Sequence, residues 1–139
     1  MTKNFATKEL VPPEVYAERG EAASQLMDKR IVDVAQWISD KTGKDIIVNG
    51  TLAGHIYTES GLRNFNTTTG AKWSQHKYGR ALDLKVVGMT PEEGRQLLKD
   101  NWEELKAIGL TCIEKDTPGW VHIDCRYTGL DYLLEVPYK

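Results

Sequence analysis

The sequence predicts an α+β fold in which a small antiparallel sheet packs against helices. Apolar residues recur at helical spacing from Glu21 to about Thr42, and Thr90-Pro91 has the residue types of a second helix start. The strand candidates are short apolar or alternating runs at residues 45–49, 80–87, 110–114 and 120–125. Between the last two runs, Pro118-Gly119 is typical of a turn that joins antiparallel strands.

The length and composition suit one domain with a hydrophobic core. The chain has 139 residues, of which 40% are hydrophobic and 27% are charged, and we treat residues 1–139 as a single domain. The net charge of -2 does not indicate a nucleic-acid partner. No run approaches the apolar length of a membrane span, so we expect no membrane partner, and we expect a monomer.

The N-terminal residues and the cysteines indicate the cellular compartment in which the chain folds. The first nine residues contain no apolar run, so we expect no signal peptide. Cys112 and Cys125 are too few for a disulfide framework and lack CxxC spacing, so we interpret them as buried thiols. We therefore expect a chain that is made and folded in a cytoplasm.

The first half of the chain divides into an arm, a helix and a loop. Residues 1–20 are expected to cap the core, with a short helix that starts at Pro12-Pro13 and runs to about Arg19. Gly43 ends the long predicted helix, and the strand at 45–49 follows. Residues 50–72 then form a long polar stretch that carries Arg63 and leads to Trp73. A loop of this length is functional or disordered, and we favour a substrate-binding loop.

The second half begins with a capped helix. Thr90 is the predicted cap, Pro91 is the first helical residue, and Glu93 completes a capping box. We expect this helix to end before Gly109 and to be followed by the two late strands. The tail after Tyr127 is expected to pack as an edge element.

Two imidazoles and one carboxylate are the residues that carry chemistry. His76 and Asp83 stand seven residues apart around Gly79, with Asp83 in the predicted strand and His76 in the loop before it. His122 lies on a later strand, and Trp120 shares its face. Two His and one Asp are suitable ligands for a catalytic zinc that keeps a position open for water. A carboxylate within an apolar strand is costly unless it is paired or metal-bound.

A zinc peptidase also needs a general base and a donor to the oxyanion. Arg63 is the best donor candidate, because its planar guanidinium suits a carboxylate or an oxyanion.

The motifs resemble a known family. The string SxHxxGxAxD at residues 74–83, followed by WxHxD at 120–124, is similar to the zinc D-Ala-D-Ala carboxypeptidase and L-alanyl-D-glutamate endopeptidase family, which shares its metal site with the hedgehog signalling domain. The segment at residues 60–63 resembles the SGYR segment of that family, with Leu62 in place of Tyr. The resemblance spans roughly residues 45–126.

The resemblance implies a hedgehog-like peptidase fold, zinc held by His76, Asp83 and His122, and peptidoglycan stem peptides as substrate. It places Arg63 on the substrate, and we add Ser74 and Trp120 as candidate substrate contacts. Members include bacterial wall-trimming enzymes and phage endolysins. We expect an endolysin-like member that acts on the cell wall after lysis or release.

The general base is the point where this sequence departs from the family. Many members have Glu or Asp three residues before the last His, where this chain has Gly119. A two-residue Pro118-Gly119 turn would leave Asp124 as the carboxylate on the face of His122. A register shifted by one would instead place Glu114 directly opposite His122. We favour Glu114, with Asp124 and Asp116 as the alternatives.

Two other functions stay open beside a zinc peptidase. Gly119 supports a non-catalytic binding module that keeps the zinc site, and a cytoplasmic dipeptidase acting on small D-amino-acid peptides is the third possibility. The sequence leaves open whether a terminal or an internal bond is cut.

Overall fold

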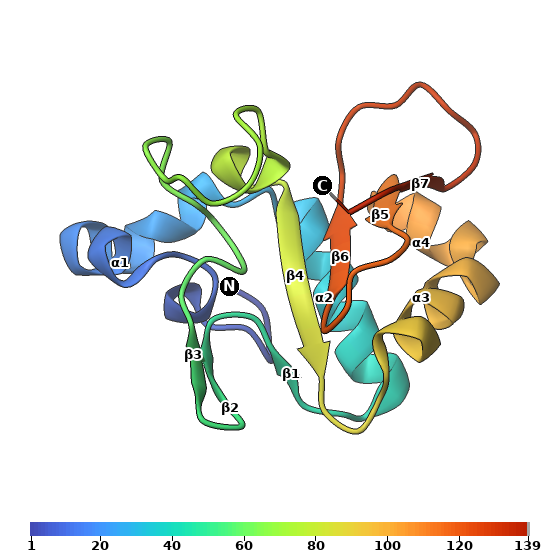
Figure 1. The fold of residues 1–139 in the computed structure, drawn as a ribbon, viewed down its shortest axis with the longest axis horizontal. Helices are drawn as coiled ribbons and strands as arrows, with labels where there is room; N and C mark the ends of the chain where they lie inside the picture. Colours follow the sequence, from blue (N-terminus) through green and yellow to red (C-terminus); the bar gives the residue numbers. More distant parts are fainter. Residues whose placement is uncertain (139) are drawn as a thin grey trace.

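The computed structural model describes residues 1–138, and its centre is a five-stranded sheet (Figure 1). The strand order is β1 (Ile46–Ile47), β4 (Ala81–Val86), β6 (Val121–Asp124), β5 (Cys112–Glu114) and β7 (Leu134–Val136). The three pairs from β1 to β5 are antiparallel, but β5 and β7 are parallel. The α+β architecture is therefore as expected, with a mixed rather than a wholly antiparallel sheet.

The direction of β7 follows from where the preceding strand ends. Because β6 is antiparallel to β5, Asp124 at the end of β6 is paired with Cys112 at the start of β5. Leu134, the first residue of β7, is also paired with Cys112. Residues 125–133 thus cross one end of the sheet, and the chain enters β7 in the direction of β5. The tail forms an edge strand, as the sequence predicts.

Helices α2 (Lys29–Thr42) and α3 (Pro91–Asp100) pack against the apolar face of the sheet, and α4 (Trp102–Ile108) packs against both helices. In Figure 1, α2 lies behind β4 and β6. Leu82 and Leu84 of β4 are fully buried in the core together with Ile31 and Val34 of α2. The alternation along β4 therefore leaves Asp83 and Lys85 on the opposite face, where the functional site forms.

The helix boundaries differ from the sequence expectation in two places. The helix predicted to start at Glu21 is a 3₁₀ helix over Gly20–Leu26, and α2 begins only at Lys29, after an extended Met27. Asp28 caps α2 by accepting the backbone N–H of Arg30. The helix that begins at Pro91 has the predicted capping box, but it breaks at Asn101, whose backbone is not helical and whose side chain donates to the carbonyl of Leu97.

The N-terminal residues lie against the core. They include a 3₁₀ helix at Thr7–Glu9 and the short helix α1 (Pro13–Arg19). Phe5, Leu10 and Val11 are buried, as an arm that caps the core requires. Among the described residues, no helix has both the length and the apolar character needed to cross a membrane.

Part of the predicted loop is a hairpin. β2 (Gly50–Leu52) pairs with β3 (His55–Tyr57) in a separate two-stranded sheet. Ala53 and Gly54 between them both have positive φ, as a two-residue hairpin turn of type I′ requires. The remainder, residues 58–74, is irregular and leads into a 3₁₀ helix at Gln75–Tyr78.

Candidate metal centre

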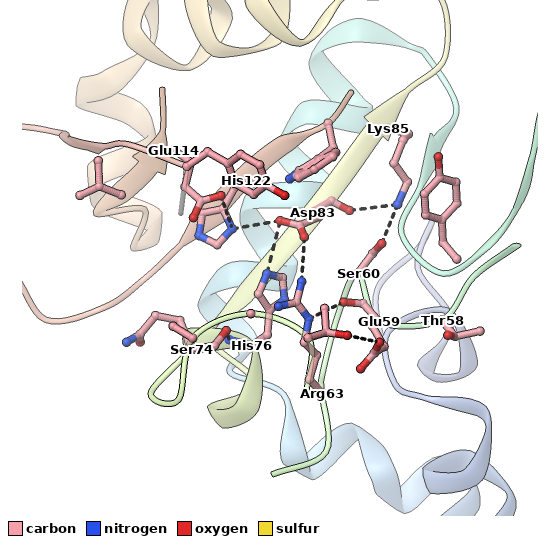
Figure 2. Close-up of a pocket in the computed structure, with 18 of the residues that line it drawn as sticks. Thr58, Glu59, Ser60, Arg63, Ser74, His76, Asp83, Lys85, Glu114 and His122 are labelled. Atoms are coloured by element: carbon pink, nitrogen blue, oxygen red, sulfur yellow. Dashed lines mark hydrogen bonds and ion pairs between the residues drawn. The ribbon is translucent and has the colours of Figure 1, made fainter. Parts of the chain in front are cut away.

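Three buried side chains converge at the middle of the sheet (Figure 2). Asp83 on β4 is paired directly with His122 on β6, so both side chains leave the same face of the sheet. His76 comes from the 3₁₀ helix before β4. Asp83 Oδ1 lies 3.3 Å from His76 Nε2 and 3.0 Å from His122 Nδ1. One ligand atom from each of the three residues lies within 4.8 Å of the others, a group that could hold a metal ion.

Gly79 allows His76 to reach this point. The hydroxyl of Ser74 accepts the backbone N–H of His76 and caps the 3₁₀ helix, which ends at Gly79 with a left-handed backbone at φ +68°. A Cβ at Gly79 would lie 1.9 Å from the carbonyl oxygen of Leu26. The spacing from His76 to Asp83 therefore depends on a residue without a side chain.

Each imidazole uses its second nitrogen to bond to the protein. His76 Nδ1 donates to the carbonyl of Gly61 at 2.8 Å, which leaves Nε2 toward Asp83. His122 Nε2 donates to Asp124 Oδ2 at 2.7 Å, which leaves Nδ1 toward Asp83. This is the arrangement that orients metal-bound histidines and sets their tautomers. Two oriented imidazole nitrogens and a carboxylate oxygen are a donor set that fits zinc.

The charges of the group are tightly coupled. Burial disfavours the charged form of Asp83, yet His76 and His122 hold the pKa of its carboxyl well below the usual range. Burial also disfavours a charged His122, but its bonds to Asp124 and Asp83 raise the pKa of this imidazole to about 9. The site therefore favours positive charge between these side chains, which a divalent cation would supply in place of a proton.

Residues 60–63 hold Asp83 and His76, two of the candidate metal ligands, through backbone hydrogen bonds. The carbonyl of Ser60 accepts the N–H of Asp83 at 2.7 Å, and the N–H of Arg63 donates to the carbonyl of His76 at 3.0 Å. Gly61, whose carbonyl holds His76, has no room for a side chain, since a Cβ there would lie 2.2 Å from the carbonyl oxygen of Leu10. This segment therefore belongs to the site through its peptide groups as well as through Arg63.

Arg63 contacts a metal-ligand candidate directly. Its Nη2 donates to Asp83 Oδ2 at 3.2 Å, and its Nε donates to the carbonyl of Glu59 at 2.8 Å. Nη1 lies on the side of Gly70, where an added Cβ would be 2.6 Å away. The guanidinium thus holds the second oxygen of Asp83 while it lines the cleft, a role that the sequence does not reveal.

The hairpin between β5 and β6 has the register that brings Glu114 to the site. Cys112 is paired with Asp124 and Ile113 with Ile123, so the alternative with Cys112 opposite Cys125 is wrong. Six residues separate the strands instead of two. Glu114 Oε1 lies 3.7 Å from His122 Nδ1 and faces the cleft (Figure 2). Burial raises the pKa of Glu114 above its usual value.

The other two carboxylates considered as a base are engaged elsewhere. Asp124 is 0% exposed and is bonded to His122 and to Arg126, whose Nη2 lies 2.6 Å from its Oδ2. Asp116 lies in the turn, where its Oδ1 accepts the backbone N–H of Tyr138. Gly119, at the position of the usual family carboxylate, is exposed and has open space around it.

A cleft of about 980 Å³ opens over the group. Its walls include Trp73, which is 68% exposed, and Trp120, whose ring packs edge-on against Tyr138 at 5.3 Å. Ser74 also lines the cleft, although its hydroxyl serves first as the cap for His76. His55 and Tyr57 of the hairpin form another part of the wall. The long stretch before His76 therefore does border the candidate site.

The sequence motifs do not identify two residues that support the site. They present Asp124 only as a candidate base, although its place two residues after His122 puts it on the same face. Lys85 stands two residues after Asp83 and lines the cleft as well. Burial lowers the pKa of Lys85 to about 8. Lys85 could have been identified from the sequence as a charged residue on the same face of an apolar strand as Asp83.

A cleft with a His–Asp–His group at its base, on an α+β scaffold, defines a candidate metal-dependent hydrolase. A family model described as Peptidase M15 matches residues 4–124. Since this match covers most of the chain, the protein belongs to the Peptidase M15 family, and the family resemblance seen in the motifs is confirmed. Searches of curated proteins and of solved structures returned no match.

Proposed function

We propose that this protein is a zinc peptidase that hydrolyses peptide bonds in the stem peptides of peptidoglycan. The observation that carries the proposal is the His76–Asp83–His122 group at the base of a cleft, with the carboxylate of Glu114 3.7 Å from a ligand nitrogen. Zinc bound there would acidify a water molecule and polarise a carbonyl group. Peptidoglycan as substrate, and action on the wall after release from the cell, are parts of this proposal.

The chain's own residues have separate roles in it. Glu114 is placed to accept a proton from the attacking water and to return it to the leaving amine, and burial raises its pKa toward the range that suits a general base. Asp124 and the carbonyl of Gly61 orient the two imidazoles. Arg63 holds Asp83 and offers the rest of its guanidinium to an oxyanion or a substrate carboxylate.

The experiment is digestion of purified sacculi with zinc present and after chelation, with the released fragments weighed by mass spectrometry. Glu114→Gln is expected to keep zinc and fold but to lower hydrolysis by a factor on the order of 10²–10⁴. Glu18→Gln, an exposed change on α1, is the matched control and should digest like the wild type.

The same experiment separates the alternatives. His76→Ala and Asp83→Ala should lose the metal, which elemental analysis measures directly. A protein that holds about one zinc per chain and releases no fragment would be a binding module of this fold, the reading that Gly119 favours. Release from small D-amino-acid peptides but not from sacculi would identify a dipeptidase.

A further inference from the structure

Lys85 is a buried cation in the cleft, on the same face of β4 as Asp83. The residue is 5% exposed. Its Nζ donates to the carbonyl of Val48 at 2.7 Å and to the hydroxyl of Ser60 at 2.8 Å, and it lies 3.5 Å from the carbonyl oxygen of Asp83. The ring of Tyr57 covers it, with the ring centroid 3.9 Å from Nζ. All these contacting groups are neutral.

Among the described residues, Lys85 lacks the adjacent carboxylate partner that Arg63 and Arg126 have in the cleft wall. Arg63 is paired with Asp83, and Arg126 is paired with Asp124. Within residues 1–138, no carboxylate oxygen lies within 4.0 Å of Lys85 Nζ. Burial of a cation whose direct contacts are all neutral is costly even with Asp83 nearby, so this ammonium favours an anionic group that enters the cleft.

The position of Lys85 limits where such a group sits on a substrate. In Figure 2, Asp83 lies between Glu114 and Lys85. Lys85 Nζ lies 3.5 Å from the backbone carbonyl oxygen of Asp83 and lines the same cleft, so an anionic group that reaches Lys85 lies beside the candidate metal centre.

We propose that Lys85 determines specificity by binding a carboxylate of the peptide substrate beside the metal centre. The inference rests on the proposed peptidase function and deepens it, because it assigns the substrate class as acidic peptides. The carboxylate comes either from the C-terminus of the peptide or from an internal residue. A C-terminal carboxylate at Lys85 favours a carboxypeptidase, because it brings the end of the peptide beside the metal centre.

The test compares three soluble stem peptides in the presence of zinc: one with all carboxylates free, one with the C-terminus amidated, and one with the internal carboxylates amidated. Binding is measured by calorimetry on Glu114→Gln, and hydrolysis on the protein with Glu114 intact. We expect one amidated peptide to bind and react on the order of 10–100-fold less well than the free acid, because a charge-assisted hydrogen bond is lost.

Lys85→Met should remove this preference by raising KM for the free acid, with kcat changed far less. Lys85→Arg should keep most of it, since the charge is retained. Lys99→Met removes an exposed lysine on α3 and serves as the control, with the preference intact. Zinc content and melting temperature show whether a Lys85 variant has lost its fold. If it has, the proposal is judged from the comparison of the three peptides on the protein that keeps Lys85.

The outcomes separate the two proposals. Equal binding of all three peptides overturns the role of Lys85, even if all three are hydrolysed. A preference that persists in folded Lys85→Met overturns it as well. Preferential binding of the free acid without hydrolysis of any peptide supports the carboxylate site and contradicts the peptidase function. Loss of binding on amidation of the C-terminus or of internal carboxylates identifies which source Lys85 recognises.

Discussion

Replacing Asp124 by Asn tests whether this carboxylate orients His122 or acts as the base. In the structure, Asp124 is fully buried and accepts hydrogen bonds from His122 Nε2 at 2.7 Å and from Arg126 at 2.6 and 2.9 Å. Asn keeps the shape and can still accept one bond from His122. It loses the negative charge and leaves the Arg126 guanidinium without its partner.

The expected cost has two parts. Removing one partner of a buried pair destabilises a fold by about 3–5 kcal/mol, and the partial exposure of Arg126 favours the lower end. About 3 kcal/mol corresponds to a fall in melting temperature on the order of 10 °C. Changing a residue that orients a metal ligand typically weakens metal affinity by about 10–100-fold.

The assay is a zinc titration with hydrolysis and metal content followed together. If Asp124 only orients His122, kcat of Asp124→Asn at saturating zinc should return to within a few-fold of the wild type. Glu114→Gln, in contrast, should stay inactive at every zinc concentration. A folded, zinc-loaded Asp124→Asn whose kcat stays lowered by about 10²–10⁴ would refute this reasoning and move the role of general base to Asp124.

Three further predictions follow from the same contacts. Arg63→Ala should lower kcat by roughly 10²–10³ and also weaken zinc binding, because Nη2 holds Asp83. Arg63→Lys should restore neither property fully. Unchanged kinetics and zinc affinity in Arg63→Ala would remove Arg63 from the site. Gly79→Ala should lower the free energy of unfolding by about 1–3 kcal/mol in urea denaturation, because Gly79 has a positive φ and an added Cβ would lie 1.9 Å from a carbonyl oxygen. Gly119→Ala should be neutral, since nothing lies within 4 Å of an added Cβ there. Equal urea midpoints for the two variants would contradict this prediction. Burial raises the pKa of Cys112 and of Cys125 to about 12, so at pH 8 both should resist a thiol reagent in the folded protein and react in denaturant, and rapid labelling of the native chain would contradict their packing.

Local signals account for the parts of the fold that the sequence predicted well. The capping box at Thr90 and Glu93 and the alternation along β4 depend only on residues near one another in the chain. The hairpin of β2 and β3 was missed because its strands have three residues each, too few for a periodic pattern. The start of α2 was placed too early because apolar residues continue through the 3₁₀ helix before Asp28.

The amino-acid sequence alone determined the chemical identity of the candidate metal site. The motifs around His76, Asp83 and His122 predict two imidazoles and a carboxylate as zinc ligands, with Asp83 on a strand, His76 in the loop before it and His122 on a later strand. The tertiary structure places these three residues within reach of one ion.

Only the tertiary structure decided which other residues join that site. The register of β5 against β6 brings Glu114 to His122, and a shift of one residue would have turned Glu114 away. That register depends on how the turn and the sheet pack together, which the strand sequences do not encode. The same holds for Arg63 on Asp83, Asp124 on His122 and the buried ammonium of Lys85, since each contact joins groups whose distance is set by packing.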